Sequence, residues 1–231
     1  MFIYDTHVHS RVCSACAHDN VQDLVHAYKG AGYSGFVLTD HFYHGNTRVD
    51  RNLPWEDFVR TYHDTYLEAK RVGDELDFDV IFGLEEWVGD GKEYLLYNIS
   101  LEFLLANPDI PHIDRAELAR RVHAAGGFVS YAHPYRYRDY MGKYVEPEFG
   151  DVDAVEIYNA CNHPDENERA DAAAKEHGLL FTCGSDLHSV RQIESGNMAG
   201  VMLTHRVTDG AELVAALREP ETRPYIKENS I

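Results

Sequence analysis

Histidines and acidic residues in this chain gather where short apolar stretches give way to polar ones. Asp5-Thr6-His7-Val8-His9 opens the chain, and later clusters hold His41, His133, Asp186 and His188. In an α/β barrel the C-terminal ends of the strands face one rim, so residues far apart in sequence converge there. Imidazoles and carboxylates that converge on one rim are what a multinuclear metal site requires.

The spacing within two of these clusters favours shared metal binding. On a strand, residues i and i+2 lie on the same face, so His7 and His9 can hold one ion together. Asp186 and His188 repeat this spacing near the other end of the chain. A single H-x-H pair is weak support for a metal site, but its conjunction with Glu85 and the other clusters predicts one.

Strands that alternate with helices must position these clusters. We expect strands over residues 2–4, 35–39, 79–84, 94–99, 128–132, 154–158, 179–183 and 199–203. We expect helices that begin after Asp19 or Asn20, at Pro54, near Phe103, after Asp114, and over residues 165–177 and 209–217. This alternation implies right-handed crossovers and a mainly parallel sheet. No repeat or linker divides the chain, so we expect one domain over residues 1–231.

Composition excludes several classes of function. The chain has 231 residues and a net charge of −18, from 39 acidic and 21 basic residues. Because phosphate backbones and membrane surfaces attract basic faces, we expect neither a nucleic-acid polymer nor a membrane as a partner. No apolar run reaches membrane-spanning length, no signal peptide opens the chain, and four cysteines do not resemble a disulfide framework. We therefore expect a cytoplasmic protein.

The motifs resemble those of the PHP (polymerase and histidinol phosphatase) superfamily of metal-dependent phosphoesterases. The matches are, in family order, H-x-H at His7 and His9, T-D-H at His41, G-x-E at Glu85, A-H-P at His133, and G-S-D-x-H at Asp186 and His188. The resemblance implies a distorted TIM-like (β/α)7 barrel with two or three divalent metal ions at its C-terminal rim. It also implies that these residues are the ligands, with Glu85 bridging two ions and His41 binding a third.

Two departures from the family pattern concern the ligand set. The usual Ser-x-Asp or His after the first motif is replaced by a segment that contains Cys13, Cys16 and His18. We predict His18 as the missing third-metal ligand; the alternatives are a surface histidine or a separate zinc site made with Cys13 and Cys16. The usual histidine between Glu85 and His133 is also missing, and Glu93, Asn98 or water are the candidates to replace it.

The segment from Pro134 to Gly150 is too long and polar to be an idle connection. Arg136 lies three residues after a candidate ligand, and its guanidinium fork matches the oxygens of a phosphate. We predict Arg136 as a catalytic and substrate-binding residue, with Tyr135 and His44 as further substrate contacts. The bulk of this segment favours a small phosphorylated metabolite over a long polymer.

We predict hydrolysis of a small phosphomonoester, and histidinol-phosphate-, nucleotide- and sugar-phosphate-like substrates all stay open. A hydroxide that bridges two ions would attack phosphorus, and Asp186 or a water would protonate the leaving group. The histidine-rich ligand set with hard carboxylates suits Zn, Mn or Fe better than Mg alone.

Two alternatives from other classes stay open. An amidohydrolase-type enzyme that cleaves a C–N bond also uses H-x-H and strand-end ligands, but typically needs a lysine where this chain has Glu85. A non-catalytic metal-binding regulatory module is the other, and the complete set of candidate ligands argues against it.

Overall fold

The computed structural model describes residues 1–227, so the last four residues of the domain expected over 1–231 lie outside the described residues. The strands are β1 (Phe2–Val8), β2 (Gly35–Leu38), β3 (Asp79–Gly89), β4 (Lys92–Tyr97), β5 (Phe128–Ala132), β6 (Ala154–Asn159), β7 (Leu180–Gly184), β8 (Met198–Leu203) and β9 (Arg223–Lys227). The helices are α1 (Val21–Gly30), α2 (Trp55–Glu75), α3 (Leu101–Ala106), α4 (Arg115–Ala124), α5 (Pro164–His177), α6 (Arg191–Glu194) and α7 (Gly210–Leu217). Short 3-10 turns lie at Ile110–His112 and Asp139–Met141.

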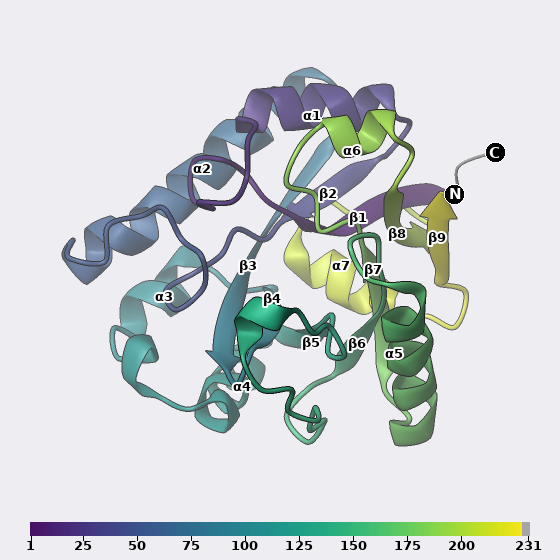
Figure 1. Ribbon diagram of the computed structural model, residues 1–231. Coiled ribbons are helices and arrows are strands. Elements are labelled where there is room, and N and C mark those ends of the chain that lie inside the picture. The colour runs from purple at the N-terminus through teal and green to yellow at the C-terminus, as the bar shows by residue number, and fades with distance from the viewer. Residues whose placement is uncertain (228–231) are drawn as a thin grey trace.

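The nine strands form one sheet in the order β7-β6-β5-β4-β3-β2-β1-β8-β9. The sheet curls until β7 lies beside β1, where Val8 and Leu187 pair in parallel and His9 N donates to Leu187 O at 3.0 Å (Figure 1). Strands β1 to β7 therefore form a nearly closed barrel, while β8 and β9 continue the sheet outside it. This confirms the distorted, TIM-like α/β barrel.

The sheet is less parallel than the alternation of strands and helices implied. Pairs β1–β2, β2–β3, β5–β6 and β6–β7 are parallel, whereas β4 is antiparallel to both neighbours and β8 is antiparallel to β1 and β9. Strand β9 was not expected at all. The expectation of a mainly parallel sheet was wrong because β3 and β4 are joined by a tight turn and not by a helix.

That turn also corrects the boundary of β3. We expected the strand to end at residue 84, but it continues to Gly89 and returns through Asp90 and Gly91, which have φ of 54° and 70°. Positive φ at two central residues is the geometry of the hairpin turns that Asp-Gly favours. Glu85 therefore lies inside a strand, and Trp87 on β3 faces Glu93 on β4.

Helix starts agree with the capping residues in the sequence. The Asn20 side chain accepts a hydrogen bond from Asp23 N before α1, and the Asp114 side chain accepts one from Glu117 N before α4. Both bonds satisfy a backbone N–H that has no partner inside its helix. The predicted N-caps are confirmed, with Asn20 and not Asp19 capping α1.

Two faces of the sheet bury separate apolar clusters. Inside the barrel, Tyr4, Ile81 and Leu95 pack with Leu213 and Leu217 of α7, which plugs the end opposite the strand carboxyl ends. Outside it, helices α1 and α2 cover one side of the sheet and α5 covers another (Figure 1). Each helix therefore fixes the strands that carry polar residues at the other end of the barrel.

The long connection between β5 and β6 contains one 3-10 turn, Asp139–Met141, and no longer helix or strand. Two cations hold it in place: Lys92 donates to Pro134 O at 2.7 Å, and the Arg169 guanidinium lies 4.2 Å from the centre of the Tyr135 ring. This connection is the loop that carries Arg136 and Met141 over the barrel rim.

None of the helices within residues 1–227 combines the length and the hydrophobicity that a bilayer crossing requires.

Close packing between two strands generates a prediction about the fold. A Cβ atom added at Gly184 would lie 2.4 Å from His7 Cβ and 2.8 Å from Glu156 Oε1. Because the backbone of β7 approaches β1 this closely, we expect Gly184→Ala to reduce the free energy of unfolding by about 1–3 kcal/mol. Urea denaturation of the purified variant measures this change.

The matched control is Gly150→Ala, since a Cβ added there meets no atom within 4 Å. We expect its free energy of unfolding to stay within about 0.5 kcal/mol of the wild type. Equal stability of the two variants would show that β1 and β7 are not in close contact.

Candidate metal centre

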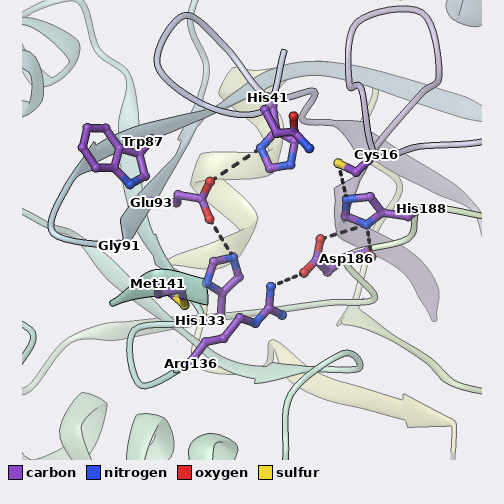
Figure 2. A pocket seen from close by; sticks show the side chains of 11 residues that line it. Cys16, His41, Trp87, Gly91, Glu93, His133, Arg136, Met141, Asp186 and His188 are labelled. Carbon is purple, nitrogen blue, oxygen red and sulfur yellow. Dashed lines mark hydrogen bonds and ion pairs between the residues drawn. The ribbon is translucent and has the colours of Figure 1, made fainter. Parts of the chain in front are cut away.

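Histidines and carboxylates from six strands or strand ends meet at one end of the barrel. Donor atoms within 4.8 Å of one another form four groups: His7, His9 and Glu85; His7, His133 and Asp186; His41, Glu85 and Glu93; and His9, His41 and His188. All but Glu93 and His188 are buried. Seven of the eight predicted ligands are therefore brought together, and Figure 2 shows five of the clustered side chains around the pocket.

Glu85 lies at the centre of this cluster. Its Oε1 is 3.1 Å from His7 Nε2 and 3.1 Å from His133 Nε2. Its Oε2 is 2.7 Å from His41 Nδ1 and 3.4 Å from His9 Nε2. Each oxygen thus faces one imidazole from β1 or the residue after it and one from the end of another strand. The carboxylate therefore lies between two groups of nitrogen donors, as a carboxylate that bridges two cations would.

Several atoms at the cluster centre lack a hydrogen-bond partner. Among the described residues, His7 Nε2, His9 Nε2, His41 Nδ1 and Glu85 Oε2 are buried and make no hydrogen bond of acceptable geometry, despite the short distances between them. Buried polar atoms are rarely left unsatisfied in proteins, so such a group calls for a specific explanation. Nitrogen and oxygen donors that converge without partners fit divalent metal ions.

The outer ring nitrogens of these histidines are engaged in the way that metal ligands usually are. His7 Nδ1 lies 2.9 Å from Glu156 Oε1, and His188 Nδ1 lies 2.9 Å from the backbone oxygen of Asp186. His9 Nδ1 lies 3.1 Å from Ser14 Oγ. When the outer nitrogen donates its proton to such an acceptor, the inner nitrogen presents its lone pair to the cluster.

Ser14 links this outer shell to the strand ends. Its hydroxyl donates to Asp40 at 2.6 Å and accepts from the His41 backbone N–H at 3.0 Å. Asp40 also accepts from Ser10 N and Ser10 Oγ, both at 2.7 Å. One carboxylate therefore fixes the loop after β1 relative to the end of β2.

The mutual charges of the cluster shift its pKa values in opposite directions. Burial alone would raise the pKa of Glu85, but His7 and His41 bring it well below its usual value. Burial alone would lower the pKa of His7, but Glu85 and other carboxylates raise it well above its usual value. For His9, burial and the neighbouring His188 and His41 together lower the pKa.

Asp186 and Arg136 form an ion pair beside the cluster. Arg136 Nη1 lies 2.7 Å from Asp186 Oδ2, while its Nη2 and Nε donate to Asn159 and Asn162 at 2.8 and 2.9 Å. Burial would raise the pKa of Asp186, but His7 and Arg136 bring it well below its usual value. Asp186 therefore carries a negative charge in this cluster, the form in which a carboxylate binds a metal ion.

The backbone is strained at two of the candidate ligands. His133 has φ of 28° and Asp186 has φ of 49°, in the region that residues other than glycine rarely adopt. Such conformations cost about 1–3 kcal/mol each and concentrate at functional sites. Here they turn both side chains inward where their strands end.

Glu93 takes the place of the histidine missing between Glu85 and His133. Its Oε1 lies 3.6 Å from His41 Nδ1 and its Oε2 lies 3.5 Å from His133 Nε2. Burial and the neighbouring Glu85 raise its pKa. Of the candidates named from the sequence, Glu93 lies in the cluster, whereas Asn98 bonds to Gly126 O elsewhere.

His18 does not join the cluster, contrary to the prediction. Its side chain is exposed and lines a surface hollow with Arg11 and Arg48, because the loop after β1 turns it outward. Cys16 faces the cluster instead, with Sγ 3.0 Å from His188 Nε2.

Cys13 points away from both Cys16 and the cluster. It is buried in the apolar cluster outside the barrel, and its Sγ lies 3.5 Å from Thr65 Oγ1. The alternative of a separate zinc site that combines Cys13, Cys16 and His18 is therefore contradicted.

Two predicted substrate contacts also lie elsewhere. His44 Nδ1 pairs with Glu86 Oε1 at 2.5 Å, and the ring also bonds to the backbone of Pro111. Tyr135 packs beneath Arg169 and against the apolar cluster between α5 and β6. Neither side chain lines the cavity over the candidate ligands, because each is held by its own partners.

Glu156 is a site residue that the sequence reasoning missed. It is fully buried on β6, contacts His7 Nδ1 through Oε1, and accepts from His133 N at 2.9 Å through Oε2. The sequence feature that could have identified Glu156 is its position as a carboxylate in the middle of the apolar strand Ala154–Asn159. A buried acidic residue needs partners, so that position indicated a polar neighbour inside the barrel.

A cavity of about 520 Å³ opens over the cluster. Its inner wall is polar, whereas Trp87 and Met141 form the side away from His188 (Figure 2). Trp87 is 39% exposed although it is a large aromatic side chain. The cavity therefore combines a charged floor with one apolar wall, and its size suits a small molecule.

Comparisons with known proteins agree with the geometry. The PHP domain family model matches residues 5–188, and a PHP-associated model matches residues 164–222. Among curated proteins, none matches the sequence.

Several solved structures share the fold at low identity. A two-domain protein of Bacteroides vulgatus containing a predicted PHP-like metal-dependent phosphoesterase superposes with a TM-score of 0.72 at 16% identity; the alignment covers 98% of this chain but 65% of that one. A candidate metal-dependent phosphoesterase of Bifidobacterium adolescentis gives 0.55 at 17% identity, covering 93% and 95%. An amidohydrolase of Chromobacterium violaceum with bound sulfate gives 0.50 at 14% identity, covering 84% and 96%.

At such identities the solved structures show the fold alone. The family model, in contrast, spans the chain from the His7–His9 pair to the Asp186–His188 pair. The chain belongs to the PHP domain family.

Proposed function

We propose that this protein is a metal-dependent phosphoesterase that hydrolyses small phosphomonoesters. The observation that carries the proposal is Glu85, whose two oxygens each face two imidazoles at the floor of a cavity. Convergent donors at the base of a pocket of this size favour metal-assisted hydrolysis of a small substrate.

The residues divide around Glu85 into two sets of ligands. His7, His9 and Asp186 lie on one side, with Asp186 Oδ1 at 3.5 Å from His7 Nε2 and 3.2 Å from His9 Nε2. His41, Glu93 and His133 lie on the other side, and the proximity of His188 to His9 and His41 supports a third ion. Imidazole and carboxylate donors favour Zn, Mn or Fe. Such ions, when bound, activate water and offset the charge on a phosphoryl group.

Arg136 supplies the fixed positive charge at the edge of the cavity. Three of its five N–H groups bond to Asp186, Asn159 and Asn162, which leaves two for a phosphate oxygen. The same three bonds hold the guanidinium rigid, so a substrate pays little conformational entropy to use it. Arg136 thus orients both a candidate ligand and the proposed phosphate.

The apolar wall indicates where the leaving group lies. With phosphate over the cluster, the rest of the substrate extends toward Trp87 and Met141, and Met141 closes over Gly91. A planar aromatic or heteroaromatic leaving group would stack on the exposed indole. The acidic surface, with its net charge of −18, disfavours a polyanionic polymer.

Cleavage of a C–N bond, as in amidohydrolases, is the alternative that the assay tests, and it is not the function that we propose. Glu85 occupies the bridging position, and no lysine lines the cavity within the described residues. The decisive experiment assays phosphomonoesters, phosphodiesters and amides with added Zn, Mn or Fe, each against a metal-chelated control. Release of phosphate supports the proposal, cleavage of amides alone would replace it, and no turnover with any metal would favour a binding module.

We expect Glu85→Gln to lose metal and activity together, because it removes the charge shared by both ligand sets. Elemental analysis of the wild type should find two or three ions per chain, and the variant should hold fewer. Loss of a residue that hydrogen-bonds to a metal ligand typically costs roughly 10- to 100-fold in activity. The kcat of Glu85→Gln should fall by more than that.

The control for this variant is Glu75→Gln, whose side chain is 64% exposed at the end of α2. The neighbouring Glu86 is unsuitable because it is buried and bonds to His44. A Glu85→Gln protein with normal metal content and turnover would place the bridge elsewhere.

Replacing Arg136 tests its proposed phosphate contact. We expect Arg136→Ala to lower kcat/KM, and the decrease should correspond to a loss of about 2–4 kcal/mol of transition-state stabilisation. Arg136→Lys keeps the charge but not the fork, so it should also lose activity. Steady-state kinetics with metal content measured in parallel separates a lost phosphate contact from a displaced Asp186.

Arg138→Lys is the matched control, since Arg138 pairs with Glu166 and does not line the cavity. Wild-type kcat/KM in both Arg136 variants would remove this residue from the proposed site.

Substitution of Trp87 tests the leaving-group wall. We expect Trp87→Ala to raise KM for aryl or nucleoside monophosphates by roughly 2- to 10-fold, from the loss of about 0.5–1.5 kcal/mol of stacking. KM for glycerol phosphate should not change, so that substrate is the internal control. An equal rise for both substrates would show a general disturbance of the site and not a stacking contact.

A further inference from the structure

The loop after β1 carries a cysteine to the candidate metal centre. Cys16 Sγ lies 3.0 Å from His188 Nε2 and lines the same cavity as His41 and Asp186 (Figure 2). The cysteine is half-buried and faces the cavity, whereas the His18 side chain two residues later faces solvent. The proposed function so far leaves this thiol without a role.

Main-chain hydrogen bonds on both sides fix Cys16 in this position. Ala15 N donates to Asn46 O at 2.8 Å, and His18 N donates to His188 O at 2.9 Å. The second bond ties the loop to the residue whose ring the thiol contacts. These backbone bonds therefore hold the loop so that Cys16 lies beside His188.

The ring of His188 is oriented so that a lone pair faces the sulfur. Its Nδ1 bonds to the Asp186 carbonyl oxygen, so Nδ1 carries the proton and Nε2 faces Cys16. Two further imidazoles converge here, since His9 and His41 each offer a ring nitrogen within 4.8 Å of the His188 donor. His9 Nε2 is buried without a hydrogen-bond partner. A sulfur at hydrogen-bond distance from one of three convergent nitrogens is a donor available to the same ion.

We infer that Cys16 is a metal ligand and that its thiolate, together with His188 and His41, binds one ion of the centre. The thiol loses its proton on binding, since the thiolate is the form that coordinates metals. A thiolate beside imidazoles selects borderline ions such as Zn²⁺, Co²⁺ or Fe²⁺ and disfavours Mg²⁺. The inference rests on the metal-binding part of the proposed function and not on the substrate.

The other cysteines do not offer this chemistry. Cys13 and Cys183 are buried in apolar clusters, and Cys161 Sγ lies 3.5 Å from the backbone oxygens of Ser185 and Asp186. Cys161 is nevertheless exposed and close to the cavity, which makes it the matched control for Cys16.

The test is absorption spectroscopy of the full chain reconstituted with Co²⁺ after removal of its metals. A thiolate bound to Co²⁺ gives a near-ultraviolet charge-transfer band that imidazole and carboxylate ligands do not give. We expect this band in the wild type and in Cys161→Ser, and we expect its loss in Cys16→Ser. The affinity for one Co²⁺ per chain should fall by at least roughly 10- to 100-fold in Cys16→Ser, the range known for loss of outer-shell partners.

Cys16→Asp guards against a variant that simply misfolds, because aspartate keeps an anionic donor at this position. It should retain more bound Co²⁺ than Cys16→Ser and lack the band. A band that persists in Cys16→Ser, or a wild type that binds Co²⁺ without one, would overturn the thiolate ligand and leave the phosphoesterase proposal standing. A wild type that binds no Co²⁺ would count against both.

Discussion

The buried Glu85 carboxylate is the constraint on which the rest of the site depends. Fully enclosed, it would be costly to ionise without compensation, and removal of one partner from a buried pair typically costs about 3–5 kcal/mol. The fold supplies that compensation through four imidazoles that reach Glu85 from β1, β2 and β5. The four imidazoles that stabilise the buried carboxylate also surround it with nitrogen donors, so the carboxylate lies where it could bridge two cations.

The positions of these imidazoles depend on structural features that a regular (β/α) barrel lacks. The pairing of His41 with Glu85 continues the β2–β3 ladder beyond the end of β2, with Phe42 N donating to Glu85 O at 2.7 Å. The β3–β4 hairpin then adds Glu93 from an antiparallel strand, and the strained backbone at His133 turns its ring inward. The departures from parallel (β/α) order therefore coincide with the residues of the site.

The sequence indicated the candidate ligands better than it indicated the strands and turns that carry them. His7, His133 and Asp186 follow apolar runs, and that local signal is sufficient because strand ends share one rim. The hairpin was not predicted although Asp90-Gly91 is a strong turn signal, because the strand before it was expected to end at residue 84. The choice between Cys16 and His18 depends on which way a loop turns. That direction is set by contacts with residues 46 and 188, which a local pattern does not contain.

The charge of the whole chain and the charge of the proposed substrate have the same sign, and this limits how the site can work. With a net charge of −18, long-range attraction does not steer a phosphate ester toward the cavity. Beyond about 8–10 Å that repulsion is screened at physiological ionic strength, so the local charges decide binding. Within that range Arg136 supplies a fixed positive charge, and three of its five N–H donors are already bonded to Asp186 and two asparagines. In the proposed function, attraction for the phosphate would therefore come mainly from ions held by the histidines, and the candidate ligands would then control substrate affinity as well as chemistry.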